Sequence, residues 1–511
     1  MELTGALTPE QPVAEELPRE KITMPAARLS VLSSNEVETL TGATFQLLES
    51  TGVLVREPRA HRLLLSAGAV GTPDEECVRI PETLLREALS KVPREWTWYS
   101  RDPAHSFRIG DGGRVRLGPG SSCTNVWDYE SRQARRPTVQ DATDMVRLMD
   151  ALEFVDINFT PVNKETDDLP ARWHESASLV HDLMNSVKPP VGPSYDGTMA
   201  RDALAIAAIL AGGEEALRKH PMVAGYCDPV SPLVHDRMMT ETLIEYAALG
   251  QPVFVTALDL AGGSAPATLA GTLVQQNAEV LSGVLIAHLV NPTAPVIYGS
   301  VSGIMDMRAG TAAVGGPEFS LLSVASVQLA HRFGIPCAAG GQSDSKMPDA
   351  QAAMEKAMTL FASTMAGADF VDLFYGSFEG FNTTCLEQIV IDHDIAASVF
   401  RFRDGIAFDE AHLGLDILRG VGPGGNFFKN RAALTHTRRW MQTEDFFPDV
   451  ADRRSRFAWE RAGSPSTLDL AHARAKKLLQ EHQGIPMDPA MVAAMQAELE
   501  RIRKESLHPV G

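Results

Sequence analysis

The chain has 511 residues, of which 44% are apolar and 22% are charged, and its formal net charge is −19. These totals allow a large buried core in one or more domains, and they exclude the basic surface that binds nucleic acid or anionic membranes. Five cysteines without a CxxC pair indicate a reducing compartment, and no uninterrupted apolar run approaches the length of a transmembrane helix. The acidic first residues, MELTGALTPEQPVAEELPRE, do not resemble a signal peptide, so we expect a cytoplasmic protein.

The N-terminal part of the chain predicts two regions. Residues 1–25 are rich in Pro and Glu, which is typical of a disordered tail. Residues 26–113 predict an α+β subdomain. It begins with an amphipathic helix that buries Val37, Leu40 and Phe45, and it ends with two short strands before the Gly-rich turn at 110–113.

A repeat of strand-like and helix-like segments follows over residues 114–405. The apolar strand-like segments are eight in number and begin near Val115, Phe154, Pro189, Met222, Pro252, Val296, Pro336 and Phe370. Their spacing of roughly 30–45 residues leaves room for a strand, a loop and a helix. The repeat predicts a TIM (β/α)8 barrel rather than an open doubly wound sheet, and no GxGxxG motif supports nucleotide binding. Residues 406–511 predict a C-terminal helical extension that packs on the barrel or on a second subunit, as in a homo-oligomer.

In such a barrel, the residues just after each strand share one mouth, where the chemistry of this fold is located. Aromatic and acidic side chains are frequent at these positions, and four of the seven tyrosines fall there. Aromatic faces together with carboxylates suit a cation, especially a quaternary ammonium, which has no hydrogen to donate. The alternative is that the rings only fill the top layer of the barrel. The candidates are Tyr195, Tyr226, Tyr298, Tyr375, Phe378 and Phe381, with Asp196, Asp228, Asp259, Asp306, Asp344 and Glu379.

Other chemistries have weaker support in the sequence. Cys123, Cys227, Cys337 and Cys385 lie on or near predicted strand ends, where a zinc site is conceivable, but no HxH, HExxH or CxxC motif accompanies them. No GxSxG motif indicates a serine nucleophile. We therefore predict no metal, and keep a metal-assisted barrel enzyme as an alternative.

Several long stretches resemble the trimethylamine methyltransferase family. They are LGPGSSCTNVWD (117–128), NPTAPVIYGSVSGIMDMRAGTAAVGGPEFSLL (291–322), GIPCAAGGQSDSKMPDAQAAMEKAM (334–358), FVDLFYGSFEGFNTTCLEQIVIDHDIA (370–396) and GPGGNFF with the HTRRW segment after it (422–440). The resemblance covers about residues 30–460. It implies a TIM barrel that moves a methyl group from a methylamine to the cobalt of a corrinoid, cobalamin, carried by a small partner protein, with no tightly bound cofactor of its own.

The resemblance also implies a substrate class. In the trimethylamine-specific members, pyrrolysine lies close to the loop that matches GGQSDSK, whereas this chain has ordinary residues there, including Gln342. A quaternary ammonium leaves as a neutral amine and needs no such activation, so a substrate of the glycine betaine type is expected. We assign catalytic roles to Gln342, Asp344 and Glu379, and assign Arg308, with Lys346 as a second candidate, to a substrate carboxylate. A non-catalytic quaternary-amine-binding protein is a further alternative.

Overall fold

The computed structural model describes residues 28–120, 122–162 and 170–507. The predicted disordered tail therefore lies outside the described residues. The chain divides into two compact units, and we call residues 28–399 with 448–511 the body and residues 400–447 the arm. These two units do not coincide with the three domains expected at 26–113, 114–405 and 406–511, and those domain boundaries stay predictions.

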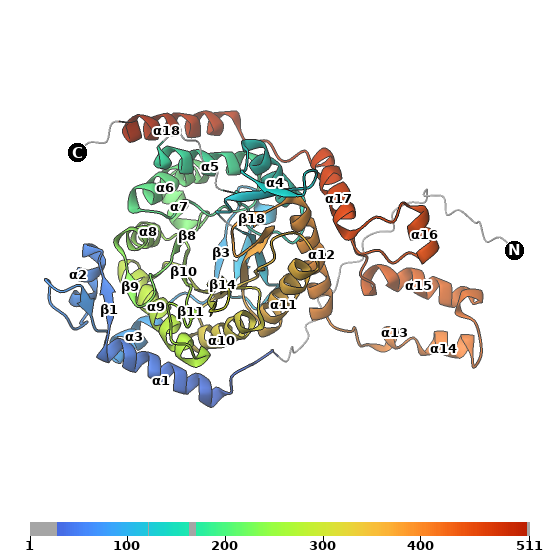
Figure 1. The fold of residues 1–511 in the computed structure, drawn as a ribbon, viewed down its shortest axis with the longest axis horizontal. Coiled ribbons are helices and arrows are strands. Elements are labelled where there is room, and N and C mark those ends of the chain that lie inside the picture. Colours follow the sequence, from blue (N-terminus) through green and yellow to red (C-terminus); the bar gives the residue numbers. More distant parts are fainter. Residues whose placement is uncertain (1–27, 121, 163–169, 508–511) are drawn as a thin grey trace. The chain divides into compact units, whose positions relative to one another are not determined.

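A six-stranded parallel sheet forms the centre of the body, in the order β5-β16-β15-β12-β10-β8. Helices surround this curled sheet (Figure 1). The expected parallel α/β architecture is thus confirmed for six of the eight predicted strand positions. These strands are β5 (Arg116–Pro119), β8 (Gly225–Cys227), β10 (Val253–Ala257), β12 (Val296–Ser300), β15 (Cys337–Gly340) and β16 (Phe370–Tyr375).

Two extended segments lie in sequence between β5 and β8 at the other two predicted positions. Asp156 N donates to Leu117 O at 2.9 Å, and Asn158 N donates to Pro189 O at 3.0 Å. Gly192 N then donates to Ala224 O at 2.9 Å, just before β8. Neither segment is a regular strand. In the second, KPPVGPS, prolines remove the backbone donors that a ladder requires.

The helices follow the strands as the sequence predicts. The side chain of Asp349 accepts hydrogen bonds from the first turn of α11, and Gly367 ends that helix at φ 88°. Pro317 begins α10, and Gly334 ends it at φ 68°. The bounds are α4 (Val139–Ala151), α5 (Ala171–Asn185), α6 (Gly197–Ala211), α7 (Glu214–Lys219), α8 (Arg237–Ala248), α9 (Leu269–Val290), α10 (Pro317–Phe333), α11 (Ala350–Ala366) and α12 (Leu386–Arg403).

Helix α9 is the one helix in the described ranges that is long and apolar enough to cross a membrane by length and composition. Within its most apolar window, 83% of the residues are buried inside the protein. Its face toward β10 and β12 and its contacts with α8 and α10 explain this composition, which is that of a core helix.

The N-terminal elements pack on the sheet and its helices. Helix α1 lies along α9, and β1 pairs in parallel with the short strand β9 (Val234–His235). The β3–β4 hairpin contributes Trp98 and Phe107 to the same buried cluster as Phe254 and Phe370. The bounds are α1 (Ser34–Ser50), β1 (Val53–Val55), α2 (Pro58–Ser66), β2 (Cys77–Val78), α3 (Glu82–Leu89), β3 (Trp96–Trp98) and β4 (Phe107–Ile109).

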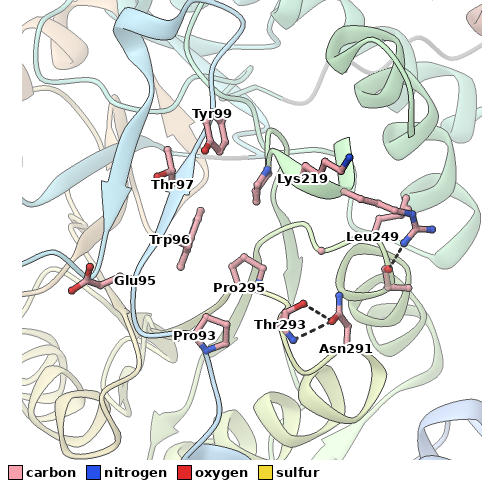
Figure 2. A pocket seen from close by; sticks show the side chains of 14 residues that line it. Pro93, Glu95, Trp96, Thr97, Tyr99, Lys219, Leu249, Asn291, Thr293 and Pro295 are labelled. Carbon is pink, nitrogen blue, oxygen red and sulfur yellow. Dashed lines mark hydrogen bonds between the residues drawn. The ribbon is translucent and has the colours of Figure 1, made fainter. Parts of the chain in front are cut away.

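A cavity of about 480 Å³ lies beside this hairpin (Figure 2). Trp96, Tyr99 and Pro295 line it, together with residues at the ends of α7, α8 and α9. Pro295 comes directly before β12, so this cavity lies at the amino ends of the strands. In enzymes built on parallel α/β barrels, that end serves stability rather than catalysis.

Short strands form two small sheets from the connections after the central strands, one with the order β11-β13-β14 and one with the order β17-β18-β6-β7. Beyond the arm, α17 packs on α4, and α18 packs on α5 and α6. The bounds are β6 (Asn125–Asp128), β7 (Gln133–Arg135), β11 (Leu260–Ala261), β13 (Gly303–Asp306), β14 (Thr311–Ala313), β17 (Ser377–Phe378), β18 (Thr383–Thr384), α13 (Glu410–Leu413), α14 (Leu415–Val421), α15 (Arg431–Glu444), α16 (Arg456–Arg461), α17 (Thr467–Glu481) and α18 (Pro489–Leu507).

Candidate functional site

Alternation along the central strands separates two faces of the sheet. A Cβ on Gly225 would meet the ring of Tyr246 on α8, and a Cβ on Gly283 of α9 would meet Val255, so Gly225 and Val255 face the helices. Because side chains alternate, the neighbouring Tyr226 and Phe254 face the inner side of the curled sheet. Their rings stack there with centroids 4.8 Å apart and an interplanar angle of 24°.

The inner face carries a hydrogen-bonded tyrosine and carboxylate. The hydroxyl of Tyr226 donates to Asp372 Oδ2 at 2.5 Å, which joins β8 to β16 across the interior. Asp372 also accepts a hydrogen bond from the backbone N–H of Leu373 at 2.8 Å. Burial raises the pKa of Asp372 to about 6. Burial, followed by the charge of the neighbouring Asp372, raises the pKa of Tyr226 well above its ordinary value.

A second carboxyl group, that of Asp228, lies close to this pair. Burial and then the charge of Asp372 raise its pKa to about 7. Asp228 is nevertheless exposed to solvent. Protein atoms therefore surround this carboxyl group, although solvent still reaches it.

Small and polar groups on the neighbouring strands complete this surface. A Cβ on Gly299 would lie 2.2 Å from Thr256 Oγ1, so the two residues share the inner face. The buried Thr256 hydroxyl has no hydrogen-bond partner among the residues that the structure describes. We call Tyr226, Asp228, Thr256 and Asp372, with Phe254 beneath them, the inner cluster. It presents two carboxyl groups, two hydroxyls and an aromatic ring near the carboxyl ends of β8, β10 and β16.

The loop after β15 holds the backbone next to Asp372. Gln342 is fully buried, and its amide donates to Leu373 O and to Ser377 Oγ, the latter at 3.0 Å. Leu373 has φ 56° at a register shift of β16, a strained conformation for a γ-branched residue. Gln342 thus fixes the irregular backbone that places the Asp372 carboxyl.

The other two residues predicted as catalytic hold loops together. The carboxylate of Asp344 accepts from the backbone of Val314 and Gly315, the latter at 2.8 Å. Glu379 accepts a hydrogen bond from the Thr383 hydroxyl across the β17–β18 turn. Both side chains stabilise loops through these hydrogen bonds, and their catalytic roles stay predictions.

Tyr298 and Tyr375 are fully buried. Tyr298 faces α9, where its hydroxyl donates to Asn277 Oδ1 at 3.1 Å and lies 3.4 Å from Gln276 Nε2. Tyr375 packs edge-on against Phe374 with ring centroids 5.1 Å apart. The structure therefore does not bring these two rings into contact with Tyr226, and neither has a solvent-accessible face.

The remaining predicted aromatic residues are dispersed. Phe378 is fully buried with Trp127 and Cys385, while Phe381 packs beside Val301 and Phe319. Tyr195 is 44% exposed. Arg308 is exposed in the β13–β14 turn, which Asp306 stabilises by accepting from Arg308 N at 2.8 Å.

Two other predicted acids have structural contacts. Asp196 caps α6 through the N–H groups of Thr198 and Met199. Asp259 accepts from Gln275 Nε2 at 2.7 Å, and the same amide lies 3.1 Å from Glu279.

The four buried cysteines do not form a common site within the described ranges. The one group there with ligand-like spacing contains Cys337, His331 and Asp369, at the amino ends of β15 and β16. Arg28 Nη1 lies 2.9 Å from His331 Nδ1. A guanidinium only donates, so Nδ1 accepts and Nε2 carries the proton, which removes the lone pair that a metal would need there.

Of the inner cluster, the sequence analysis named Tyr226 and Asp228 as candidates and did not name Asp372, Thr256 and Phe254; the role of all five stays a prediction. The missed signal for Asp372 was a carboxylate inside the apolar strand FVDLFY. A charged side chain is rarely buried without a function or a partner. Phe254 and Thr256 give no such signal, because both are ordinary strand residues.

An irregular strand with a buried carboxylate near the carboxyl edge of a parallel sheet is where α/β enzymes place their chemistry. The chain belongs to the trimethylamine methyltransferase family. The family model described as trimethylamine methyltransferase (MTTB) matches residues 6–507. The protein is thus a methyltransferase, as expected from the resemblance.

Curated relatives match over nearly their whole lengths. A glycine betaine methyltransferase of Desulfitobacterium hafniense is 32% identical over 479 residues, which are 94% of this chain and 98% of that protein. A trimethylamine methyltransferase of Methanosarcina mazei is 34% identical over 492 residues, covering 93% and 95% of the two chains. Among solved structures, the monomethylamine methyltransferase of Methanosarcina barkeri matches with a TM-score of 0.52 at 12% identity, covering 90% of this chain and 89% of that one. This last likeness supports the fold alone.

Proposed function

We propose that this methyltransferase takes a methyl group from a quaternary ammonium of the glycine betaine type and passes it to the Co(I) of a corrinoid protein, or to free cob(I)alamin. The observation that carries the proposal is the inner cluster, in which Tyr226, Asp228 and Asp372 combine a ring, a hydroxyl and two carboxyl groups. The similarity to a glycine betaine methyltransferase over 98% of that protein supports the same substrate class.

We also propose that the curled sheet closes into an eight-stranded barrel. The backbone hydrogen bonds at Asp156, Asn158 and Gly192 support closure, because they continue the ladder from β5 across to β8. Closure places the inner cluster inside the barrel, near the carboxyl ends of its strands.

The chemistry requires a cation held with one methyl group directed outward. The N–CH3 bond breaks, its electron pair stays on nitrogen to give a neutral tertiary amine, and the methyl carbon bonds to cobalt, which supplies both electrons and is formally oxidised from Co(I) to Co(III). No proton transfer is needed. The protein contributes by orienting and desolvating the substrate.

The inner cluster suits this task. The ring of Tyr226, which stacks on the buried Phe254, offers an electron-rich face for an ammonium group, with about 0.5–2 kcal/mol for a cation–π contact. The raised pKa values of Asp228 and Asp372 keep the negative charge partial near neutral pH. A full negative charge would stabilise the cationic ground state more than the transition state, in which the positive charge on nitrogen decreases.

We assign supporting roles to the three residues predicted as catalytic. Gln342 positions Asp372 through the backbone of Leu373. Asp344 and Glu379 hold the loops beside it. Such groups affect the rate by maintaining the geometry of the residues that contact substrate.

The carboxylate of a betaine needs its own partner. Arg308 and Lys346 are exposed cations on loops that follow β12 and β15, and Lys346 Nζ donates to Asp344 O at 2.6 Å. We propose that Arg308 receives the carboxylate. R308A should then raise KM for glycine betaine roughly 3–10-fold, as for one exposed charge pair, and leave KM for choline, which has no carboxylate, unchanged.

The proposed context is cytoplasmic, with a corrinoid protein as partner and neither nucleic acid nor membrane involved. The net charge of −19 supports this exclusion. A homo-oligomer is also proposed.

The deciding experiment combines binding with turnover. Quaternary amines are first screened by thermal shift, because a ligand of the folded state raises Tm. Hits are then incubated with the protein and cob(I)alamin, and methylcobalamin formation is followed by absorbance. Binding without methyl transfer, with both free cob(I)alamin and a corrinoid protein as acceptor, would instead identify a quaternary-amine-binding protein. No binding by any quaternary amine would refute the proposal.

A further inference from the structure

The end of β16 leaves the regular strand ladder directly after Asp372. Val371 pairs with Leu117 of β5. The next pair joins Tyr375 to Pro119, so β16 takes four residue steps where β5 takes two. On the other side, the pairing of β16 with β15 ends at Asp372 itself. The segment from Asp372 to Tyr375 is therefore a bulge, and a bulge changes the direction of the side chains beside it.

A bulge leaves backbone groups without strand partners, and here buried side chains bind them instead. Gln342 donates to the first carbonyl that follows the regular ladder. The next carbonyl, that of Phe374, accepts a hydrogen bond from Lys356 Nζ of α11. The N–H of Gly376, two residues further along, donates to Asp392 Oδ2 of α12 at 2.8 Å.

Lys356 and Asp392 form a buried ion pair on the helix side of the bulge. Lys356 Nζ lies 3.6 Å from Asp392 Oδ2, and both side chains are fully buried. Asp392 Oδ1 also accepts from Gln388 Nε2 at 2.8 Å, and Lys356 Nζ lies 5.0 Å from the centroid of the Phe374 ring. The pair thus holds the backbone on both sides of Tyr375, through a carbonyl before it and an N–H after it.

Stability alone does not account for this pair. Burial opposes both charges, because it lowers the pKa of Lys356 and raises the pKa of Asp392 to about 6. A buried ion pair is often no more stabilising than apolar side chains of similar volume. The other buried side chains of α11 are all uncharged. What the pair provides beyond packing is a hydrogen-bond donor and an acceptor at fixed points of the bulge.

We propose that Lys356 and Asp392 are positioning residues for the methyl transfer. They hold the bulge in the backbone path that directs the Asp372 carboxyl to Tyr226, where its Oδ2 lies 2.5 Å from the hydroxyl. Within the described ranges, neither side chain of the pair has a hydrogen bond to the inner cluster, so its effect passes through the backbone. This inference rests on the function proposed above for the inner cluster.

The test variant is K356M/D392N in the full-length protein. It removes both charges together, because a single change would leave the other charge buried without its partner. The new amide oxygen can still accept from Gly376 N, whereas the Phe374 carbonyl loses its donor. Circular dichroism and thermal melting check the fold. If this variant does not fold, K356Q/D392N, whose shorter polar side chain also withdraws the donor, takes its place with the same expected losses.

The matched control is K188M. Lys188 is a second buried lysine, and its Nζ donates to Met149 O at 2.7 Å and to Leu152 O at 2.6 Å. These carbonyls belong to the end of α4, so this lysine satisfies a helix end rather than the bulge. K188M should therefore lower Tm and leave kcat/KM unchanged.

The effect on the reaction is measured as methylcobalamin formation from glycine betaine and cob(I)alamin. We expect K356M/D392N to lower kcat/KM on the order of 10–100-fold, since a displacement of about 1 Å is sufficient for losses of this size. Adding D372N should then cause little further loss, because the pair acts through Asp372. Losses that multiply in the combined variant, or an equal loss in K188M, would overturn the proposal.

Titration calorimetry with glycine betaine separates positioning from folding. A displaced carboxyl raises Kd at full stoichiometry, which is the expected result for K356M/D392N. A partly unfolded variant instead lowers the stoichiometry at the wild-type Kd, and that result would show a purely structural role and overturn the proposal.

Crystal structures of wild type and K356M/D392N separate this inference from the proposed function. We expect the distance from Asp372 Oδ2 to the Tyr226 hydroxyl to exceed about 3.5 Å in the variant, which is beyond hydrogen-bonding range. An unmoved carboxyl would overturn the inference while the proposed function stands, provided that D372N is impaired. Wild-type activity of D372N would refute the function proposed for the inner cluster, and the role of the pair in the reaction with it.

Discussion

Two tyrosines on the central sheet, Tyr226 and Tyr298, have opposite environments. Tyr298 faces α9, where neutral amides of Asn277 and Gln276 surround its hydroxyl. Tyr226 faces inward, where its hydroxyl meets a carboxylate and a second carboxyl group lies near. The outward contacts are neutral and matched, as in a stable core, whereas the inward cluster holds more negative charge than its described neighbours neutralise. A cationic substrate would neutralise this excess of negative charge.

The largest expected effect concerns Phe378, which is a buried packing residue like Tyr298. F378A removes a fully buried ring from its contacts with Trp127 and Cys385. We expect a loss of about 3–5 kcal/mol in the free energy of unfolding, as for other buried phenylalanines. Urea denaturation measures this loss. An unchanged stability with a large loss of substrate affinity would instead return Phe378 to the binding site.

Asp372 tests the inner cluster directly. D372N keeps the shape of the side chain but removes its charge, so we expect kcat/KM to fall on the order of 100-fold, equivalent to about 2.7 kcal/mol. Initial rates of methylcobalamin formation measure the effect. Since ionised Asp372 is disfavoured by burial, Tm should not fall, and wild-type activity in D372N would remove this residue from the site.

A matched pair of variants, each lacking one tyrosine hydroxyl, tests the difference between Tyr226 and Tyr298. Y226F should raise the Kd for the ammonium substrate roughly 10-fold, because Asp372 loses the donor that orients it. Y298F should leave Kd unchanged and cost about 1 kcal/mol of stability, because buried amides lose a partner. Calorimetric titration and thermal melting of both variants measure these effects. Equal effects of the two changes on Kd would contradict the assignment of the two faces.

The smallest expected effect is the dependence of binding on pH. Protonation of Asp228, with a pKa of about 7, and then of Asp372, with a pKa of about 6, removes negative charge from the inner cluster. Affinity for a quaternary ammonium, whose own charge does not titrate, should therefore fall roughly 3–10-fold between pH 8 and pH 5. In D228N the upper of the two steps should be absent. A pH-independent Kd in wild type would contradict the role of both carboxyl groups.

The same shift predicts a change in stability with a defined sign. A raised pKa means that the folded state favours protonated Asp228, so its ionisation opposes folding at high pH. D228N should therefore raise Tm at pH 8, and this gain should shrink as the pH falls from about 7 toward the ordinary aspartate value of 3.8. Melting curves at several pH values provide the measurement, and a gain in Tm that is the same at every pH would contradict the shift.

Much of the architecture was predictable from local pattern. Six central strands lie where the apolar segments indicate, and the ends of α10 and α11 follow from Pro317, Gly334, Asp349 and Gly367. These features depend on a few neighbouring residues, so sequence spacing is sufficient to find them. The segments around Asp156 and Pro189 were placed correctly along the chain, but neither is a regular strand, and in the second the prolines remove backbone donors.

The side-chain content of the site was much less predictable. Tyr226 and Tyr298 both lie in apolar strands that lead into polar loops, and the sequence gives them equal weight. A shift of one residue along a strand moves a side chain to the other face, and only contacts with distant helices show which face is inside. Asp372 was missed for a related reason: its partner, Tyr226, lies in a different strand far away in sequence.

The sequence by itself determined the repeated strand–helix order, the helix ends and the family, because each depends on short-range pattern or on long matching stretches. Only the tertiary structure decided that Tyr226 and Asp372 meet, and that Tyr298, Tyr375 and Phe378 are buried away from solvent. The physical reason is that burial and charge–charge contact are properties of surfaces brought together from different parts of the chain, and neither is present in any single segment.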